Sequence, residues 1–335
     1  MSGLAAVAKL AQVSPATASR ALHRPEMVAR ETRERVEQAA EQLGYRPNQL
    51  ARSLRTRDSR TLALVVTDIL NPFSATIAKA VQDTADQSGH NLFLFNSDEE
   101  PDKERRALET LRGHLPQGLI VVPTPGAREN LELVPDLPVI ELDRASGRPG
   151  AYTVMVDNRG GAYQAVRHLL DLGHTRIGMI VGRRNISTAQ ERYEGYCQAL
   201  DEAGLPYQEA LVLPGNHREE DGRQAATQLL SQPAGVRPTA LFVGNNEMTV
   251  GAVLAARQLQ LSLPGDLSVV GFDDSRWART TTPSITVIAQ PTYQLGQLAC
   301  QRLIQLMSGV APPEAHTRLP TTLIVRESTG PPPAR

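Results

Sequence analysis

The stretch AQVSPATASRAL, residues 11–22, decides the fold of the N-terminal part of this 335-residue chain. Ser14 is a good helix N-cap and Pro15 suits the first helical position, so we expect a helix to begin there. The apolar positions of residues 4–11 predict a short helix before it, and those of residues 30–43 predict a third. Two short helices joined by a tight turn and supported by a third are typical of a helix-turn-helix.

The second of these helices carries candidate DNA-reading residues. In a helix-turn-helix its N-terminal part enters the major groove, so Pro15 and Ala16 are expected to face base edges. Thr17 and Ser19 are expected near phosphates, and Arg20 can donate forked hydrogen bonds to a guanine or a phosphate. Three small helices are by themselves a weak signal, because many helical bundles share the pattern. The predicted DNA-contacting residues of this region are Ser14, Pro15, Ala16, Thr17, Ser19, Arg20 and His23.

Charge is distributed unevenly along the chain. Residues 1–60 contain 11 Lys and Arg against 6 Asp and Glu, whereas the rest of the chain contains 24 against 30. A basic segment followed by an acidic one indicates that the first sixty residues meet a polyanion and the remainder does not. Chance clustering of charged residues is the alternative explanation, so the uneven charge supports a DNA-binding head without establishing it.

Several motifs together resemble the head of the lactose-repressor (LacI/GalR) family, and the resemblance continues through nearly the whole chain. They are Val7-Ala8, residues 11–22, Thr32-Arg33-Glu34-Arg35-Val36 and Leu43-Gly44-Tyr45-Arg46-Pro47-Asn48. Three positions depart from the family's pattern: Gln12 stands where Gly is usual, Ala6 where Asp is frequent, and Ala29 where a Ser cap is usual. Because positions 15 and 16 are Pro and Ala, the lactose repressor's own operator preference does not carry over.

Residues 47–60 are predicted to form a hinge. Asn48 can cap a new helix, and the basic residues after it supply one or two helical turns that are too short to be stable alone. The resemblance implies that this hinge helix orders when two subunits meet on DNA. It makes Leu54 a wedge in the minor groove, with Ala51 packed between the two hinges and Asn48 nearby. A flexible basic linker is the alternative.

From Thr61 onward, short apolar runs alternate with amphipathic stretches such as residues 75–88, 160–172 and 247–261. This alternation predicts parallel sheets covered by helices on both faces, and two series of runs indicate two lobes. The expected fold class is α/β: a helix-turn-helix head followed by a two-lobed, periplasmic-binding-protein-like domain with two doubly wound parallel sheets.

The predicted domain boundaries follow from these changes in the hydrophobic pattern. The expected domains are a head over residues 1–46, a hinge over 47–60, an effector-binding and dimerisation domain over 61–330, and a disordered tail over 331–335. Within the large domain, lobe 1 is expected at about 61–157 and 289–318, and lobe 2 at about 158–288 and 319–330.

Ligands of open parallel sheets bind beyond the carboxyl ends of the strands, so the residues after each strand are candidates for a site. Carboxylates, amides and arginines dominate there, and they suit a polyhydroxylated ligand. Phe73 and Phe95 could stack on a sugar or base face. By position, the resemblance implies effector contacts for Phe73, Asp143, Arg192, Asn245 and Asp273, and it places Arg144, Thr188 and His217 on or beside other such positions.

Each of these residues also has a purely structural interpretation. Asp143 and Asp273 end strands and can cap turns, Asn245 can cap a helix, and Phe73 can belong to the core. Their joint position at strand ends favours a binding site. Ser74 stands where purine sensing would favour a second aromatic residue, so the effector class stays open between a sugar, a sugar derivative and a nucleoside.

No catalytic, nucleotide-binding or metal-binding motif is present, and the seven histidines form no ligand constellation. We therefore expect neither an enzyme nor a bound cofactor. The chain lacks an apolar run long enough to span a bilayer, it has no signal peptide, and it contains only two cysteines, Cys197 and Cys300. These features predict a cytoplasmic protein, associated with the nucleoid when bound to DNA, without a membrane partner.

The sequence thus predicts a homodimeric transcription regulator, often a repressor. Its expected partners are a double-stranded, near-palindromic operator and a small-molecule effector held between the lobes. Two alternatives are a sugar-binding, receptor-like protein without DNA function and an enzyme on a doubly wound fold. The basic head and the missing signal peptide argue against the first, and the absence of a catalytic constellation argues against the second.

Overall fold

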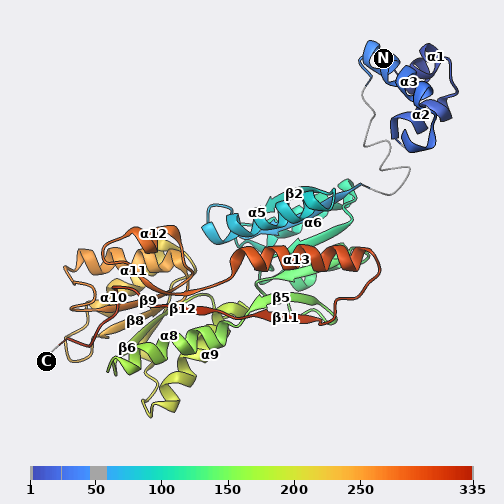
Figure 1. Ribbon diagram of the computed structural model, residues 1–335. Helices are drawn as coiled ribbons and strands as arrows, with labels where there is room; N and C mark the ends of the chain where they lie inside the picture. The colour runs from blue at the N-terminus through green and yellow to red at the C-terminus, as the bar shows by residue number, and fades with distance from the viewer. Residues whose placement is uncertain (1–2, 24, 46–58, 334–335) are drawn as a thin grey trace. The chain divides into compact units, whose positions relative to one another are not determined.

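The computed structural model describes residues 3–23, 25–45 and 59–333 (Figure 1). The chain forms two compact units, one on each side of the boundary before residue 60. Three residues predicted to act in the hinge lie outside the described residues: Asn48, Ala51 and Leu54.

The described part of the first unit contains three α-helices, in the order that the sequence predicts. Its elements are α1 (Leu4–Leu10), α2 (Pro15–His23), the 3₁₀ turn η1 (Pro25–Met27) and α3 (Arg30–Gln42). Small apolar side chains of all three helices share one core, in which Val7, Ala18 and Val36 are fully buried. The Ser14 hydroxyl accepts a hydrogen bond from the Thr17 amide at 3.1 Å, so Ser14 caps α2 as expected.

The turn between α1 and α2 explains one departure from the resembled family. Gln12 has a φ of +54°, in the left-handed region that glycine adopts without a steric penalty. A side chain there costs about 1 kcal/mol. The glycine that the family usually has at this position therefore fits the turn better than Gln12 does.

The start of α3 lacks a side-chain cap, because Ala29 stands at the N-cap position. We expect Ala29→Ser to stabilise the head by about 1 kcal/mol, since its hydroxyl can accept a hydrogen bond from an amide of the first turn. Native-state hydrogen exchange on the full chain should show this as roughly fivefold stronger protection of the α3 amides. Ala29→Val, which adds a side chain without an acceptor, is the control. Equal protection in the two variants would contradict the prediction.

The second unit consists of two lobes, each built on a six-stranded sheet. The strands of the first sheet, all parallel, lie in the order β11 (His316–Leu319), β5 (Tyr152–Val156), β4 (Val139–Leu142), β3 (Gly118–Val121), β1 (Thr61–Val66) and β2 (Asn91–Asn96). Those of the second lie in the order β12 (Thr322–Ile324), β10 (Thr286–Ala289), β9 (Ser268–Phe272), β8 (Ala240–Val243), β6 (Ile177–Val181) and β7 (Val212–Pro214). The predicted pair of doubly wound sheets is confirmed, except that the edge strand β12 is antiparallel to β10.

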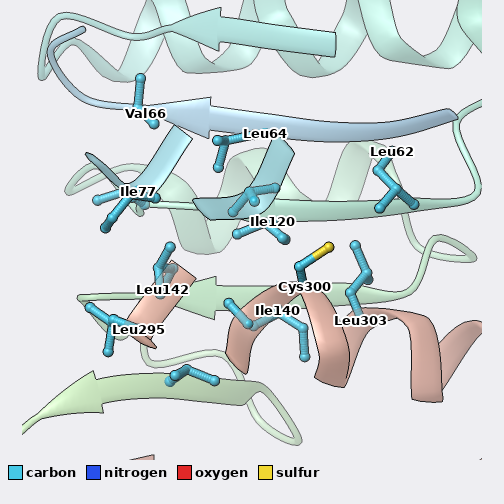
Figure 2. Close-up of a cluster of buried hydrophobic side chains, with 14 of the residues drawn as sticks. Leu62, Leu64, Val66, Ile77, Ile120, Ile140, Leu142, Leu295, Cys300 and Leu303 are labelled. Atoms are coloured by element: carbon cyan, nitrogen blue, oxygen red, sulfur yellow. The ribbon is translucent and has the colours of Figure 1, made fainter. Parts of the chain in front are cut away.

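Both faces of the first sheet are buried, which is why its strands read as continuous apolar runs. The helices α5 (Pro72–Gln87) and α13 (Thr292–Met307) cover one face, and α6 (Pro101–His114) and α7 (Ala127–Asn130) cover the other. Along β1, Leu62 and Leu64 face α13 whereas Ala63 and Val65 face α6, as the two-residue period of a strand requires. Figure 2 shows strand side chains meeting Leu303 and its neighbours on α13.

The second sheet is covered in the same way. Its covering helices are α8 (Asn158–Asp171) and α9 (Ser187–Glu202) on one face, and α10 (Glu219–Leu230) and α11 (Asn246–Gln258) on the other, with the short α12 (Arg276–Thr280) beside them. The chain passes between the two sheets three times: after β5, after β10, and between β11 and β12. The lobes are therefore joined by three adjacent connections (Figure 1).

The predicted start of one helix is wrong. α5 begins at Pro72, three residues before the expected start at Ala75. The reason is that Asn71 caps it, with its side-chain oxygen accepting the Phe73 amide at 3.0 Å. Asn71-Pro72 repeats the cap-and-proline signature that correctly marked the start of α2.

The C-terminal segment also differs from its prediction. Residues 331–333, expected to be disordered, are placed by the structure, and Pro332 lies beside Gly173. The preceding Gly330 carbonyl accepts a hydrogen bond from His174 Nε2 at 2.9 Å. The proline-rich segment is therefore anchored on the second lobe as far as Pro333, and residues 334 and 335 lie outside the described part.

Cys300 is buried in the first-lobe core and Cys197 is half-buried on α9, and neither forms a disulfide. Burial raises the pKa of the Cys300 thiol to about 12, so it stays protonated as a packing residue. Within the described ranges, every helix is too short or too polar to cross a membrane.

Candidate ligand site and DNA-reading head

A cavity of about 550 Å³ lies between the two lobes, at the carboxyl ends of strands from both sheets. Its size is typical of small-molecule sites. Most of its lining residues are polar or charged. All eight residues predicted to contact an effector line it: Phe73, Asp143, Arg144, Thr188, Arg192, His217, Asn245 and Asp273.

Arg144 is held in the cavity wall by Glu99, a residue that sequence reasoning did not select. Two guanidinium nitrogens of Arg144 each donate a hydrogen bond of 2.7 Å to a Glu99 oxygen. Burial raises the pKa of Glu99, but the charge and the hydrogen bonds of Arg144 outweigh that effect and hold it at about 2. Both groups are therefore ionised at neutral pH and paired with one another.

Asp143 is a buried acid with an unused oxygen. It follows β4 with a φ of +66°, a backbone that Asp tolerates better than most residues. Its Oδ1 has no hydrogen-bond partner among the described residues. Burial raises the pKa of Asp143 to about 6, against the lowering effect of the charges of Arg144 and Arg192. Such an oxygen is suited to accept a hydrogen bond from a ligand hydroxyl.

Arg192, on α9, is fixed in one orientation. Its Nε donates to Asn158 Oδ1 at 2.9 Å, and one terminal nitrogen donates to the Gly244 carbonyl at 2.5 Å. The guanidinium carbon lies 3.6 Å from the centre of the Phe272 ring, a cation–π arrangement. Burial lowers the pKa of Arg192, and the nearby Asp273 carboxylate opposes that shift. The planar group is thus presented to the cavity with little freedom.

Asp273 and Gln290 form a second polar pair in the cavity wall. Asp273 follows β9 with a φ of +82°, and its Oδ1 accepts a hydrogen bond from Gln290 Nε2. Gln290 was not predicted, because it follows β10 at a point that the sequence marks only as a crossing between lobes. A polar side chain directly after a strand was the signal that could have found it.

Asn245 caps a helix, as its structural interpretation predicts, and it also lines the cavity. Its Oδ1 accepts the Met248 amide at 2.9 Å, which caps α11, and its Nδ2 donates to the His217 carbonyl at 3.2 Å. His217 itself has a φ of +65°. Burial lowers the pKa of His217 to about 3, helped by the charge of Arg144, so the ring is neutral.

The two phenylalanines predicted to stack on a ligand lie on opposite faces of the first sheet. Phe73 packs against the first-lobe core and lines the cavity. Phe95 instead packs in the core on the opposite face of the sheet, against residues of α6, and it is not part of the cavity lining. Stacking on a ligand, the expectation for both, is therefore geometrically open only to Phe73.

Several contacts join the lobes within the described residues, and two of them lie beside the cavity lining. The side chains of Asn71 and Asn246 exchange hydrogen bonds of 3.1 and 3.4 Å, and the Ala145 amide donates to the Ser187 hydroxyl at 3.1 Å. Each pairs a residue of the first lobe with a residue of the second. A ligand that binds between the lobes must accommodate or replace these contacts.

In the first unit, three of the six predicted DNA-contacting residues of α2 are exposed, and the other three are partly buried. Pro15, Ala16 and Arg20 are exposed, whereas Ala18 and Ala21 face the core. The remaining predicted residues, Thr17, Ser19 and His23, are partly buried, and Ser14 serves as the cap. The exposed side is free to meet a groove of DNA, as a recognition helix requires.

Comparison with known proteins agrees with this arrangement. Residues 4–48 match the family described as bacterial regulatory proteins, lacI family, and residues 166–329 match a periplasmic binding protein-like domain. The HTH-type transcriptional repressor PurR of Haemophilus influenzae (strain PittEE) is 34% identical over 330 residues, covering 96% of this chain and 97% of that protein. Catabolite control protein A of Priestia megaterium is 33% identical over 327 residues, with coverages of 96% and 98%.

Solved structures give the same result for the fold. The Lac repressor dimer bound to operator and the anti-inducer ONPF superposes with a TM-score of 0.87 at 28% identity, covering 98% of this chain and 99% of that one. A DNA-binding head followed by two parallel-sheet lobes defines a class of ligand-responsive regulators. This chain belongs to the LacI family of bacterial regulatory proteins. It is a DNA-binding transcriptional regulator and not an enzyme.

Proposed function

We propose that the chain is a repressor that binds a near-palindromic operator as a homodimer and changes its DNA affinity when a small molecule binds between the lobes. In this proposal residues 1–46 bind DNA, residues 47–60 form the hinge, and residues 61–330 bind the effector and dimerise. The protein acts in the cytoplasm, on the nucleoid when it is bound to DNA.

The observation that carries the effector part is the cavity itself. It gathers an unused buried carboxylate oxygen of Asp143, a fixed guanidinium of Arg192 and the Asp273–Gln290 pair around a space of about 550 Å³. Each carboxylate or amide of this kind can form hydrogen bonds with two hydroxyl groups, which supports a sugar, a sugar derivative or a nucleoside as the effector. A relative that is 30% identical has been solved as a complex with cellobiose.

Control of DNA binding requires that the effector prefer one arrangement of the lobes. In this proposal the effector changes the arrangement of the lobes at the Asn71–Asn246 contact. Asn71 is the N-cap of α5, so a change in this contact reaches that helix. A ligand that alters this contact would shift α5, whose surface would pass the change to the hinge. The route through α5 is part of the proposal.

The proposal is tested by selecting sheared genomic DNA of the source organism with the purified full chain at near-physiological salt. Enrichment of one or a few near-palindromic sites is expected, and the genes beside them indicate the effector class. Recovery of unenriched DNA, both alone and with added metabolite extract, would contradict the proposal and favour a receptor-like protein without DNA function.

Arg20→Ala is expected to weaken binding to a selected site about 10- to 100-fold, because it removes a forked donor from the exposed side of α2. Arg35→Ala is the charge-matched control, since Arg35 is exposed on α3 and outside the predicted reading surface. Fluorescence anisotropy with a labelled site measures both variants. Equal losses would show that Arg20 contributes only its charge.

A further inference from the structure

The lining of the cavity carries an excess of negative charge. Its carboxylate residues are Asp68, Asp98, Glu99, Glu100, Asp143, Glu219, Glu247 and Asp273. Its cationic residues are Lys103, Arg144, Arg192 and Arg218. Burial and the charges of Asp68 and Glu219 raise the pKa of Glu247, which shows these acids acting on one another. A cavity with twice as many acids as bases repels an anionic ligand.

Three of the four cations that could offset this charge, Lys103, Arg144 and Arg192, already have partners. Lys103 pairs with Asp98 at 2.6 Å and with Glu100 at 2.9 Å. The Arg192 side chain donates hydrogen bonds within the second lobe, and Arg218 is exposed at the rim. A phosphate or carboxylate that entered the cavity and approached Lys103 or Arg144 would therefore have to displace a carboxylate that is already in place.

Glu99 is the partner that matters most, because it neutralises two donors of a buried guanidinium. The Arg144 side chain is 8% exposed and the Glu99 side chain 16%, so their interaction is little screened by water. The backbone also fixes Glu99: its φ is +60° and its amide donates to the Thr67 carbonyl at 3.2 Å. The turn after β2 thus holds this carboxylate against Arg144 before any ligand arrives.

We infer that the effector is an uncharged, polyhydroxylated molecule, and that Glu99 excludes its phosphorylated and carboxylated analogues by occupying Arg144. The inference rests on the proposed function, since it takes the cavity to be the effector site. It also gives a use to the buried Asp143 Oδ1, which lacks a partner among the described residues and accepts a hydrogen bond from a neutral hydroxyl.

The test compares wild type, Glu99→Gln and Glu109→Gln by isothermal titration of the full-length protein. The probes are neutral monosaccharides and nucleosides, their phosphate esters, the corresponding uronic acids and amino sugars, and inorganic sulfate, all at matched ionic strength. Glu99→Gln keeps a hydrogen-bond acceptor for Arg144 but removes the charge. Glu109→Gln removes an exposed carboxylate of α6 and controls for net charge and for anions bound by the head.

For the wild-type protein we expect the tightest-binding probe to be a neutral one. We also expect sulfate to produce no more binding heat with the wild-type protein than with the Glu109→Gln variant. In Glu99→Gln we expect sulfate and the phosphate esters to gain at least about tenfold in affinity, because Arg144 is released. Tighter binding of a charged analogue than of its neutral parent by wild type would overturn the inference. So would an unchanged response to anions in Glu99→Gln, a readout that does not depend on knowing the effector.

Failure of the proposed function gives a different result. If a neutral compound binds the cavity but leaves operator affinity unchanged, the effector role is wrong while the charge preference stands. If an anionic compound binds and alters operator affinity, the effector role stands and the charge preference is wrong.

Discussion

Asp143→Asn is expected to raise the free energy of unfolding by as much as about 3 kcal/mol at pH 8 while abolishing the response to the effector. The carboxylate is buried, its Oδ1 lacks a partner among the described residues, and burial raises its pKa to about 6. Asn is close to isosteric, accepts the left-handed backbone as readily as Asp does, and carries no charge to desolvate. Arg144 keeps its bidentate partner Glu99 in the variant.

The pH dependence of this gain follows from the two pKa values. The Asp143 carboxyl ionises near its ordinary pKa of 3.8 in the unfolded chain and near 6 in the folded one. Below pH 3.8 the Asp143 carboxyl is protonated in both the folded and the unfolded chain, and the stability that the raised pKa provides is fully present. It is lost as the pH rises through the folded pKa, because the folded state must then bury the charge. The advantage of Asn over Asp is therefore absent near pH 3.5, grows between pH 4 and 6, and is constant above.

Urea unfolding followed by circular dichroism at pH 4, 6 and 8 measures the difference. Asp136→Asn, which removes an exposed carboxyl in the same lobe, is the control and should change little at any of these pH values. A gain from Asp143→Asn that does not depend on pH would contradict the burial argument. Retained effector response in the variant would separate Asp143 from the site.

Gly251→Ala is expected to lower the free energy of unfolding by about 3 kcal/mol, although helix propensity alone predicts a gain of about 1 kcal/mol. Gly251 lies in α11 where that helix crosses α10. A β carbon there would lie 2.1 Å from the Glu219 carbonyl oxygen and 2.5 Å from the Arg223 amide nitrogen. Backbone atoms cannot move aside as a flexible side chain can, so the two helices would have to separate.

Gly113→Ala provides the matched control for this substitution. Gly113 is also helical, in α6, but no atom lies within 4 Å of the β carbon that would be added. We expect it to be neutral or to gain up to about 1 kcal/mol. Trp277, the chain's single tryptophan, packs with Val253 of α11 and reports the unfolding of this lobe by fluorescence. Equal effects of the two substitutions would show that the helix crossing tolerates the added methyl group.

The order of the elements could be predicted from the sequence because it depends on local patterns. Buried strands such as β1 read as apolar runs, and caps such as Ser14 mark helix starts. Topology gathers the ends of parallel strands at one edge and so made the eight cavity residues candidates, and the resemblance to the LacI family selected them from the other polar residues there. The start of α5 was missed only because the Asn71-Pro72 signature was not applied a second time.

The pairings inside the cavity could not be predicted in the same way. The Glu99–Arg144 pair joins residues 45 positions apart, and the Asn71–Asn246 contact joins residues 175 positions apart. Neither has a local pattern that marks it, because each depends on how two separate loops approach one another. The sequence therefore indicated which chemical groups surround the ligand, and the structure showed which of them are already engaged.

The three connections between the lobes have a consequence for synthesis of the protein. Five of the six strands of the first sheet come from residues 61–156, but the covering helix α13 and the strand β11 come after five of the six strands of the second sheet. Until they emerge from the ribosome, the nascent first lobe has an unpaired edge at β5 and a bare apolar face at Leu62 and Ile120. The lobe that is begun first therefore stays incomplete through most of translation, and the growing chain must protect that face while about 150 further residues are translated.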